Sequence, residues 1–206
     1  MKEDLYKKYL RNIKNGKTAI RKEYVDRGYF SYYSKREINN HLNSKRIIID
    51  GVNGYFDEFV NDTLNRIVND DDMTYLEIYL GKVGKNLSEK VQKANRDEKD
   101  IDGYNITISI NEIIHTLNEH GTSMEKLRGQ KILKGGEIKL LPYLLINIDK
   151  VKYLGKNKNK QNVYNLISIN NDGTYNLLQF INNNRHNFGF QSLFINQTNQ
   201  QKKFIP

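Results

Sequence analysis

The chain has 206 residues and carries 33 Lys and Arg against 24 Asp and Glu, a formal net charge of +9. It contains no cysteine, which excludes a disulfide framework, cysteine-ligated zinc and thiol catalysis. No apolar run approaches the roughly 18–20 residues of a membrane span, and the charged N-terminus does not resemble a signal peptide. We therefore expect a cytoplasmic protein without a membrane partner.

Helical periodicity dominates the first part of the chain. Apolar residues recur every four positions from Leu5 to Ile13, and a second apolar set runs from Tyr55 to Ile67. The acidic run at 70–72 is typical of a solvated turn. We therefore predict a mainly helical region of unknown role at residues 1–72 and a second domain at residues 73–206.

The middle of the chain mixes strand and helix patterns. The expected elements, in chain order, are a strand at 75–80, a helix at 88–96, a strand at 104–109, a helix after Ser109 or Asn111, and a helix at 136–145. Ser109 or Asn111 is placed to cap its helix, which ends at Gly121 as a C′ glycine. Pro142 must lie early in a helical turn or kink the last helix.

After residue 148 the sequence is typical of an antiparallel β-meander. The candidate strands are 150–154, 163–169, 175–180 and 190–195. Asp172-Gly173 between two alternating runs predicts a hairpin, and the connection at 182–189 looks long. Helices followed by a meander predict an α+β fold, with helices packed on an antiparallel sheet of about four strands.

The positive charge is concentrated in this C-terminal part. Residues 1–70 have a net charge of +4 and residues 71–120 a net charge of −4, whereas residues 121–206 carry 13 basic and 4 acidic side chains, a net charge of +9. A polyanion is drawn toward such a region. We therefore predict a basic sheet face beside His115 and His120.

His115 and His120 fall at the end of one predicted helix. Their spacing turns them about 140° apart, unlike the i, i+4 pair of a zinc site, so we expect no metal. Two imidazoles beside a Lys-rich sheet suit RNA cleavage, in which one takes the 2′-OH proton and the other protonates the leaving oxygen. An alternative stays open, in which His115 packs against the core and His120 helps to end the helix.

The order of several short motifs carries a resemblance. They are Tyr79 to Val83, Asp102-Gly103-Tyr104, Ile114-His115 followed by His120-Gly121, Glu125, Arg128-Gly129-Gln130, Leu141-Pro142 and Asn147 to Val151. In this order they resemble the phage barnase–EndoU–colicin–RelE-like nucleases over about residues 75–200. The sequence departs from the family pattern at Ile114, where a basic residue is usual, and after Thr198, where an aromatic residue and a Lys are common.

The resemblance implies a curved antiparallel sheet and metal-independent cleavage of RNA by side chains on its face and on the preceding helix. It implies catalytic roles for His115, His120 and Thr198, and substrate binding by Arg128, Lys131, Lys150 and Lys152. We therefore predict a phage- or mobile-element-encoded, toxin-like endoribonuclease that needs no cofactor. It would act in the bacterial cytoplasm, with tRNA as one candidate substrate and a 2′,3′-cyclic phosphate as product.

Two other functions remain open at this stage. The chain could be a non-catalytic protein that binds RNA or a ribonucleoprotein, such as an inhibitor of a bacterial CRISPR-type defence complex. It could also be a structural phage protein whose nuclease-like domain is vestigial. RNA is the expected partner of both the nuclease and the non-catalytic binding protein. A host ribonucleoprotein and a cognate inhibitor protein are further candidate partners.

Overall fold

The last four strands form the predicted meander. The computed structural model describes residues 30–31, 47–48, 60–61 and 77–197. Its meander consists of β5 (Lys150–Lys156), β6 (Asn162–Asn170), β7 (Gly173–Asn182) and β8 (Asn187–Asn196), each antiparallel to the next. Asn170 pairs with Gly173, so the hairpin predicted at Asp172-Gly173 is confirmed.

The sheet extends well beyond these four strands. β4 (Asn105–Ser109) pairs parallel to β8, and β3 (Glu77–Val83) pairs antiparallel to β4. Two further strands, β1 (Phe30–Ser31) and β2 (Ile47–Ile48), pair with β3. The predicted α+β fold with a mostly antiparallel sheet is confirmed, but the sheet has more than the four strands expected, because β4 joins β8 in parallel across some 80 residues of chain.

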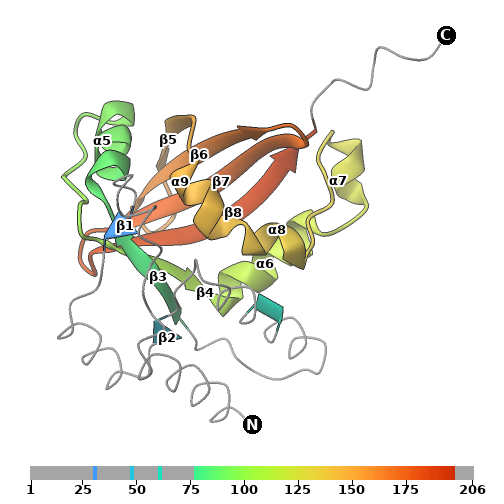
Figure 1. Cartoon of the computed structure of the whole chain (residues 1–206), viewed down its shortest axis with the longest axis horizontal. Coiled ribbons are helices and arrows are strands. Elements are labelled where there is room, and N and C mark those ends of the chain that lie inside the picture. Colours follow the sequence, from blue (N-terminus) through green and yellow to red (C-terminus); the bar gives the residue numbers. More distant parts are fainter. Residues whose placement is uncertain (1–29, 32–46, 49–59, 62–76, 198–206) are drawn as a thin grey trace.

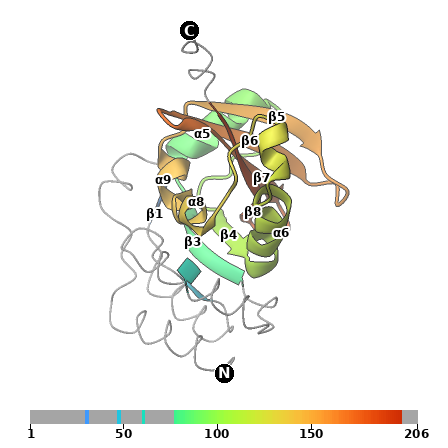
Figure 2. The same cartoon turned by 90° about the vertical axis from the view of Figure 1, so that its right-hand side faces the viewer.

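Five helices accompany the sheet within residues 77–197. They are α5 (Lys85–Ala94), α6 (Ile110–His120), α7 (Met124–Leu127), α8 (Gly135–Lys139) and α9 (Leu141–Ile146). α8 and α9 lie across one face of the meander, as the two views show (Figure 1, Figure 2). Buried apolar side chains of α5, α6, α8 and α9 form one core cluster with those of the sheet, including Phe188, Leu193 and Ile195 on β8.

The start and end of α6 are both fixed by local chemistry. Ser109 caps the helix and forms a capping box with Glu112, so of the two predicted caps Ser109 is the one used. Gly121 ends the helix, and its N–H donates to the Leu117 carbonyl at 2.8 Å. Its φ of −90° is not left-handed, contrary to the predicted C′ glycine. Glycine is needed for space instead, because a Cβ there would lie 2.2 Å from Leu117 O.

Two other local expectations change in detail. The helix predicted at 136–145 is divided into α8 and α9 at Leu140, and Pro142 lies in the first turn of α9, where its missing N–H costs no helical bond. The connection predicted as long at 182–189 is short, because β7 ends at Asn182 and β8 begins at Asn187.

Most of the predicted helical region at residues 1–72 lies outside the described residues. Of its described positions, β1 and β2 add to the sheet and Val60 is fully buried in the core cluster. Within the described part of the chain, no helix is long and apolar enough to cross a membrane.

Candidate active site

One face of the meander is turned away from α8 and α9 (Figure 1, Figure 2). Leu193 and Ile195 of β8 are buried in the core beneath the helices, so Phe194 between them points to the opposite face. Directly paired residues of adjacent strands share a face. We call this surface the far face.

Two rows of paired residues cross the far face from β8 to β5. One row consists of Phe194, Asn176, Ile167 and Lys150, and the other of Ser192, Leu178, Asn165 and Lys152. Neither row contains a carboxylate. The Asn165 amide donates to Asn176 at 2.9 Å, while Asn165 Oδ1 and Ser192 Oγ have no partner among the described residues. The far face therefore has a mixed floor, in which buried polar side chains alternate with apolar ones, and lysines lie at one edge.

His120 lies at the other edge of the far face. It is the last residue of α6, and its ring centroid is 5.7 Å from that of Phe194. The chain that follows α7 keeps it there, because Gln130 bridges to Asn196 and the Lys131 N–H donates to the Ile195 carbonyl at 2.8 Å. The end of β8 thus contacts both His120 and the chain that follows α7. We call His120 and the residues around it, from Glu125 to Lys131 and Phe194, the His120 corner.

A buried carboxylate orients the His120 ring. His120 Nδ1 lies 2.9 Å from Glu125 Oε2, and the side chain of Glu125 is 0% exposed whereas that of His120 is 13% exposed. A carboxylate oxygen accepts, so Nδ1 carries the hydrogen, and Nε2 has no hydrogen-bond partner among the described residues. This arrangement fixes one tautomer and leaves Nε2 able to take or return a proton.

Arg128 completes this cluster. Its guanidinium donates to the second oxygen of Glu125 at 2.9 Å, and its side chain remains 62% exposed. Glu125 therefore has a cationic or hydrogen-bonding partner on each oxygen, as a buried carboxylate requires. The exposed part of the guanidinium offers further N–H donors beside His120, in the fork geometry that suits phosphate.

Lys131 is held by two carboxylates. Its ammonium lies 3.1 Å from Asp172 and 3.6 Å from Glu137, and Tyr175 also donates to Asp172 at 2.8 Å. Burial alone would lower the pKa of Lys131, but the hydrogen bond and charge of Asp172 and the charge of Glu137 outweigh it and raise that pKa. Burial would raise the pKa of Asp172, but the bonds from Tyr175 and Lys131 lower it overall. The charge of Lys131 is thus already paired within the protein.

His115 has a different environment from His120. Its side chain is 58% exposed, and its Nε2 lies 3.4 Å from Glu119 on the next turn of α6. The alternative in which His115 packs against the core therefore does not hold. The structure places His115 and His120 on one helix but gives them separate carboxylate partners.

Lys150 and Lys152 share the far face with His120 but lie at its opposite edge. β5 and β8 are separated by two strands, which corresponds to about 14 Å at the usual spacing of about 4.8 Å between strands. Neither lysine can contact the same phosphate oxygen as His120 from that position. Thr198, the remaining predicted catalytic residue, lies outside the described residues.

Sequence reasoning gave no role to several groups that shape this corner. Glu125 is part of the quoted motif, but nothing in a single sequence shows that it is buried beneath His120. Phe194 and Asp172 reach the site only through the pairing of β7 and β8.

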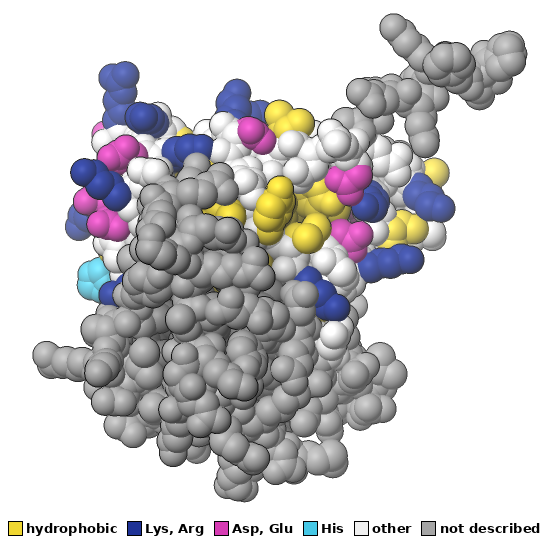
Figure 3. Space-filling model, in the orientation of Figure 1, with side chains coloured by type: hydrophobic (Ala, Val, Ile, Leu, Met, Phe, Trp, Pro, Cys, Tyr) yellow, Lys and Arg dark blue, Asp and Glu magenta, His cyan; other side chains and the backbone are white. Residues whose placement is uncertain are grey.

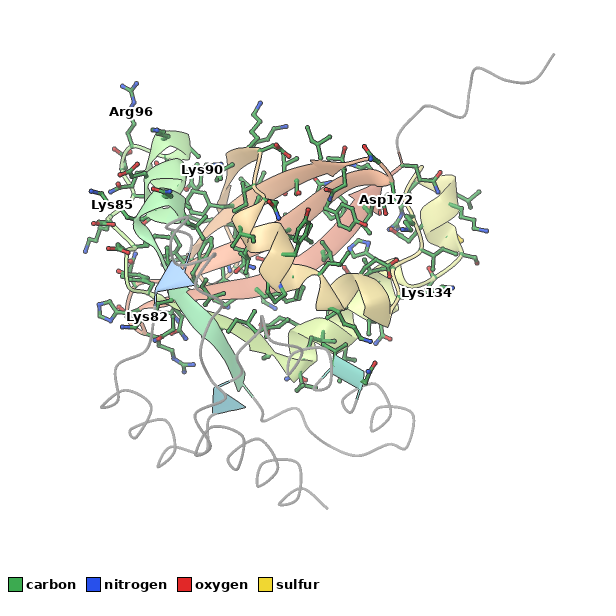
Figure 4. The ribbon with its side chains drawn as sticks, in the orientation of Figure 1. Lys82, Lys85, Lys90, Arg96, Lys134 and Asp172 are labelled. Carbon is green, nitrogen blue, oxygen red and sulfur yellow. The ribbon has the colours of Figure 1, made fainter. Side chains whose placement is uncertain are left out.

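Within the described part of the chain, no three His, Asp or Glu side chains are grouped as metal ligands would be. The labelled Asp172 marks this end of the sheet, and Lys82 marks the opposite end (Figure 4).

The model of the family described as "phage-Barnase-EndoU-ColicinE5/D-RelE like nuclease3" matches residues 81–203, which are 123 of the 206 residues. The chain belongs to this family. The matched region begins in β3 and includes α6, the His120 corner and the whole meander. Family membership supports a nuclease role and a nucleic-acid substrate. A search of curated proteins and a search of solved structures each found no match.

Proposed function

We propose that this family member is a metal-independent endoribonuclease, encoded by a phage or mobile element, that cleaves RNA by attack of a ribose 2′-OH on the adjacent phosphorus. The observation that carries the proposal is the His120 corner, where a fully buried Glu125 holds Nδ1 and leaves Nε2 free beside an exposed Arg128. A histidine with one fixed tautomer is suited to proton transfer near neutral pH.

In this mechanism His120 acts as the general base. Its Nε2 takes the proton of the 2′-OH, the O2′–P bond forms, and the P–O5′ bond breaks. The products are a 2′,3′-cyclic phosphate and a 5′-OH end. His115 stays a candidate general acid for the leaving O5′ from the family pattern, and its side chain is exposed on α6. DNA lacks the internal nucleophile, so the mechanism requires RNA.

The cations have different roles in the proposal. Arg128 stabilises the charge that develops on the phosphorane oxygens, as a donor pre-placed beside His120. Lys150 and Lys152 bind neighbouring phosphates of the same strand across the far face. Lys131, tied to Asp172 and Glu137, contributes mainly by holding the corner in place. Thr198 remains a candidate from the family pattern alone.

The test is cleavage of total tRNA in EDTA, with the fragment ends mapped for a cyclic phosphate. We expect His120→Ala to lower the rate by about two orders of magnitude or more, as loss of a general base does. His115→Ala and Thr198→Ala are measured beside it. The matched control is Lys93→Gln, on the exposed side of α5.

Two results would contradict the proposal. Cleavage that persists in both histidine variants would exclude the acid–base pair. RNA binding by the natural sequence without any cleavage would instead favour the non-catalytic RNA- or ribonucleoprotein-binding protein.

A further inference from the structure

A polar pocket lies at the end of the sheet remote from His120. It is formed by the loop between β5 and β6 and the loop between β7 and β8, and its volume is about 350 Å³. Its lining contains lysines and amides, one isoleucine and no carboxylate: Lys156, Asn159, Lys160, Gln161, Asn162, Ile181, Asn182, Asn183 and Asn184. This composition differs from the surroundings of His120, where Arg128 and Lys131 each have a carboxylate partner.

Side chains hold the β5–β6 loop in one shape. Asn157 Oδ1 accepts from the backbone N–H groups of Asn159 and Gln161, both at 3.0 Å. Lys160 has a left-handed backbone with φ of 59°. Such a conformation is costly for a residue other than glycine and persists only where the surroundings impose it.

The β7–β8 loop is held in a similar way. Asn182 Oδ1 accepts from the Arg185 N–H at 3.2 Å, and the Tyr104 hydroxyl donates to Asn183 Oδ1 at 2.9 Å. His186, whose ring meets that of Tyr104 edge-on, has a φ of 50°. Lys160 and His186 are the two non-glycine residues with positive φ among those the structure describes, and each lies in one of these loops. The pocket walls are therefore preformed.

The same hydrogen bonds determine what the pocket can offer a ligand. The side-chain oxygens of Asn182 and Asn183 are occupied, and Gln161 Oε1 accepts from Asn157 Nδ2 at 3.0 Å. The side-chain NH2 groups of Asn182, Asn183 and Gln161 remain to donate hydrogen bonds to a ligand. The neighbouring carboxylate, Glu98, is buried and is itself occupied by Asn162 and Tyr164, at 2.7 and 2.6 Å.

Positive charge accompanies these donors. Within the described part of the chain, Lys156, Lys158 and Lys160 form no ion pair. The pocket therefore presents hydrogen-bond donors and unpaired cations, which select a ligand rich in acceptor oxygens and negative charge. The visible part of the helix-covered face differs, because acidic side chains lie among its Lys and Arg, and hydrophobic ones gather over α8 and α9 (Figure 3).

We propose that this pocket binds a phosphodiester group of the same RNA strand that reaches His120, so that the protein selects substrates by length. The inference rests on the proposed function. Phe194, which contacts His120, lies seven residues along β8 from Asn187, about 23 Å at about 3.3 Å per residue. A stacked strand advances about 3.4 Å per nucleotide, so about seven nucleotides are needed to reach both sites.

The test measures binding by fluorescence anisotropy, with the full chain and 2′-O-methyl RNA, which lacks the attacking hydroxyl. One labelled strand has roughly twelve nucleotides and the other roughly four, so that only the longer strand spans both sites. The variant Lys156→Gln/Lys160→Gln is compared with Lys93→Gln/Arg96→Gln, at the end of α5 and just after it, which loses the same charge. It is also compared with Lys156→Arg/Lys160→Arg, which keeps the charge. Inorganic phosphate is titrated as a competitor.

We expect the Gln variant of the pocket to bind the long strand about tenfold more weakly and the short strand nearly as before. The slope of log K against log[salt] should fall by about 1.4 for the long strand, since each lost contact to a single strand removes about 0.7. The Arg variant should retain affinity. Free phosphate should compete with the long strand more strongly on the natural sequence than on the Gln variant, and equal competition on both proteins would overturn the inference.

Failure of this inference is distinguishable from failure of the proposed function. If the α5 variant weakens long-strand binding as much as the pocket variant does, the effect is general charge and the pocket proposal is overturned, even where RNA is still cut. If the natural sequence cuts no RNA but binds the long strand through these lysines, the nuclease proposal fails and the pocket stands.

Discussion

The two ends of the meander use charge in opposite ways. At the end near His120, Arg128 is paired with Glu125, and Lys131 with Asp172 and Glu137. At the end with the hairpin loops, Lys156 and Lys160 line a pocket without carboxylates. Paired charges position groups in a folded protein, whereas unpaired ones remain available to a ligand. Substitutions at the first end should therefore change stability, and those at the second should change binding.

The largest effect is expected at Glu125. Glu125→Ala leaves a cavity and removes the acceptor of the His120 ring, so we expect the free energy of unfolding to fall by about 2–4 kcal/mol. Urea denaturation measures it. The control Glu119→Ala removes an exposed carboxylate from α6 and should change stability by less than about 0.5 kcal/mol. If Glu125→Ala and Glu119→Ala lower the free energy of unfolding equally, the buried Glu125 contributes no more to stability than the exposed Glu119.

A pair of glycine substitutions comes next. Gly121→Ala places a Cβ 2.2 Å from the Leu117 carbonyl oxygen at the end of α6, and we expect a loss of about 1–3 kcal/mol. Gly136→Ala in α8 meets nothing within 4 Å and should instead stabilise the protein by about 0.5–1 kcal/mol. Thermal melting gives the sign of the stability change in each variant. A Gly121→Ala variant with unchanged stability would show that the end of α6 shifts readily to make room for the Cβ.

A smaller, pH-dependent effect is expected at Asp172. The folded protein lowers the pKa of this carboxyl from its ordinary value of 3.8. Its ionised form thus contributes stability that is fully present above about pH 4 and is lost as the pH falls through the folded pKa. Asp172→Asn should lower the melting temperature at pH 6 but have much less effect at pH 3. If Asp172→Asn lowers the melting temperature equally at pH 6 and at pH 3, the ionised Asp172 does not make this contribution to stability.

The smallest effect on stability is expected at the hairpin loops. Lys156→Gln/Lys160→Gln removes two charges that have no described ion-pair partner, so the free energy of unfolding should change by less than about 0.5 kcal/mol. A larger loss, measured by the same denaturation, would mean that these lysines hold the loops in shape. Together with the Glu125 variant, this result separates the two ends of the meander by experiment.

Local patterns in the sequence predicted most of the elements. The Asp172-Gly173 hairpin, the Ser109 cap and the place of Pro142 all depend on interactions within a few residues, and all are confirmed. The break at Leu140 and the short loop after Asn182 differ from expectation, because weak local propensities set such boundaries only loosely.

Long-range pairing was the part that one sequence could not supply. The parallel contact between β4 and β8 joins Asn105 to Asn187, and no local signal predicts it. The same holds for the candidate site. The histidine at position 120 and the arginine at position 128 could be named from motifs, whereas the burial of Glu125 between them follows only from the folded arrangement. The separation of Lys150 from His120 follows from strand order in the same way.

The parallel β4–β8 pair also has a consequence for synthesis of the chain. α6 follows β4 without a linker, and its last residue packs against Phe194 near the end of β8. During translation, His120 therefore leaves the ribosome more than 70 residues before Phe194, the residue that its ring contacts. A nuclease of this family would in this way complete the surroundings of His120 only after β8 had been synthesised.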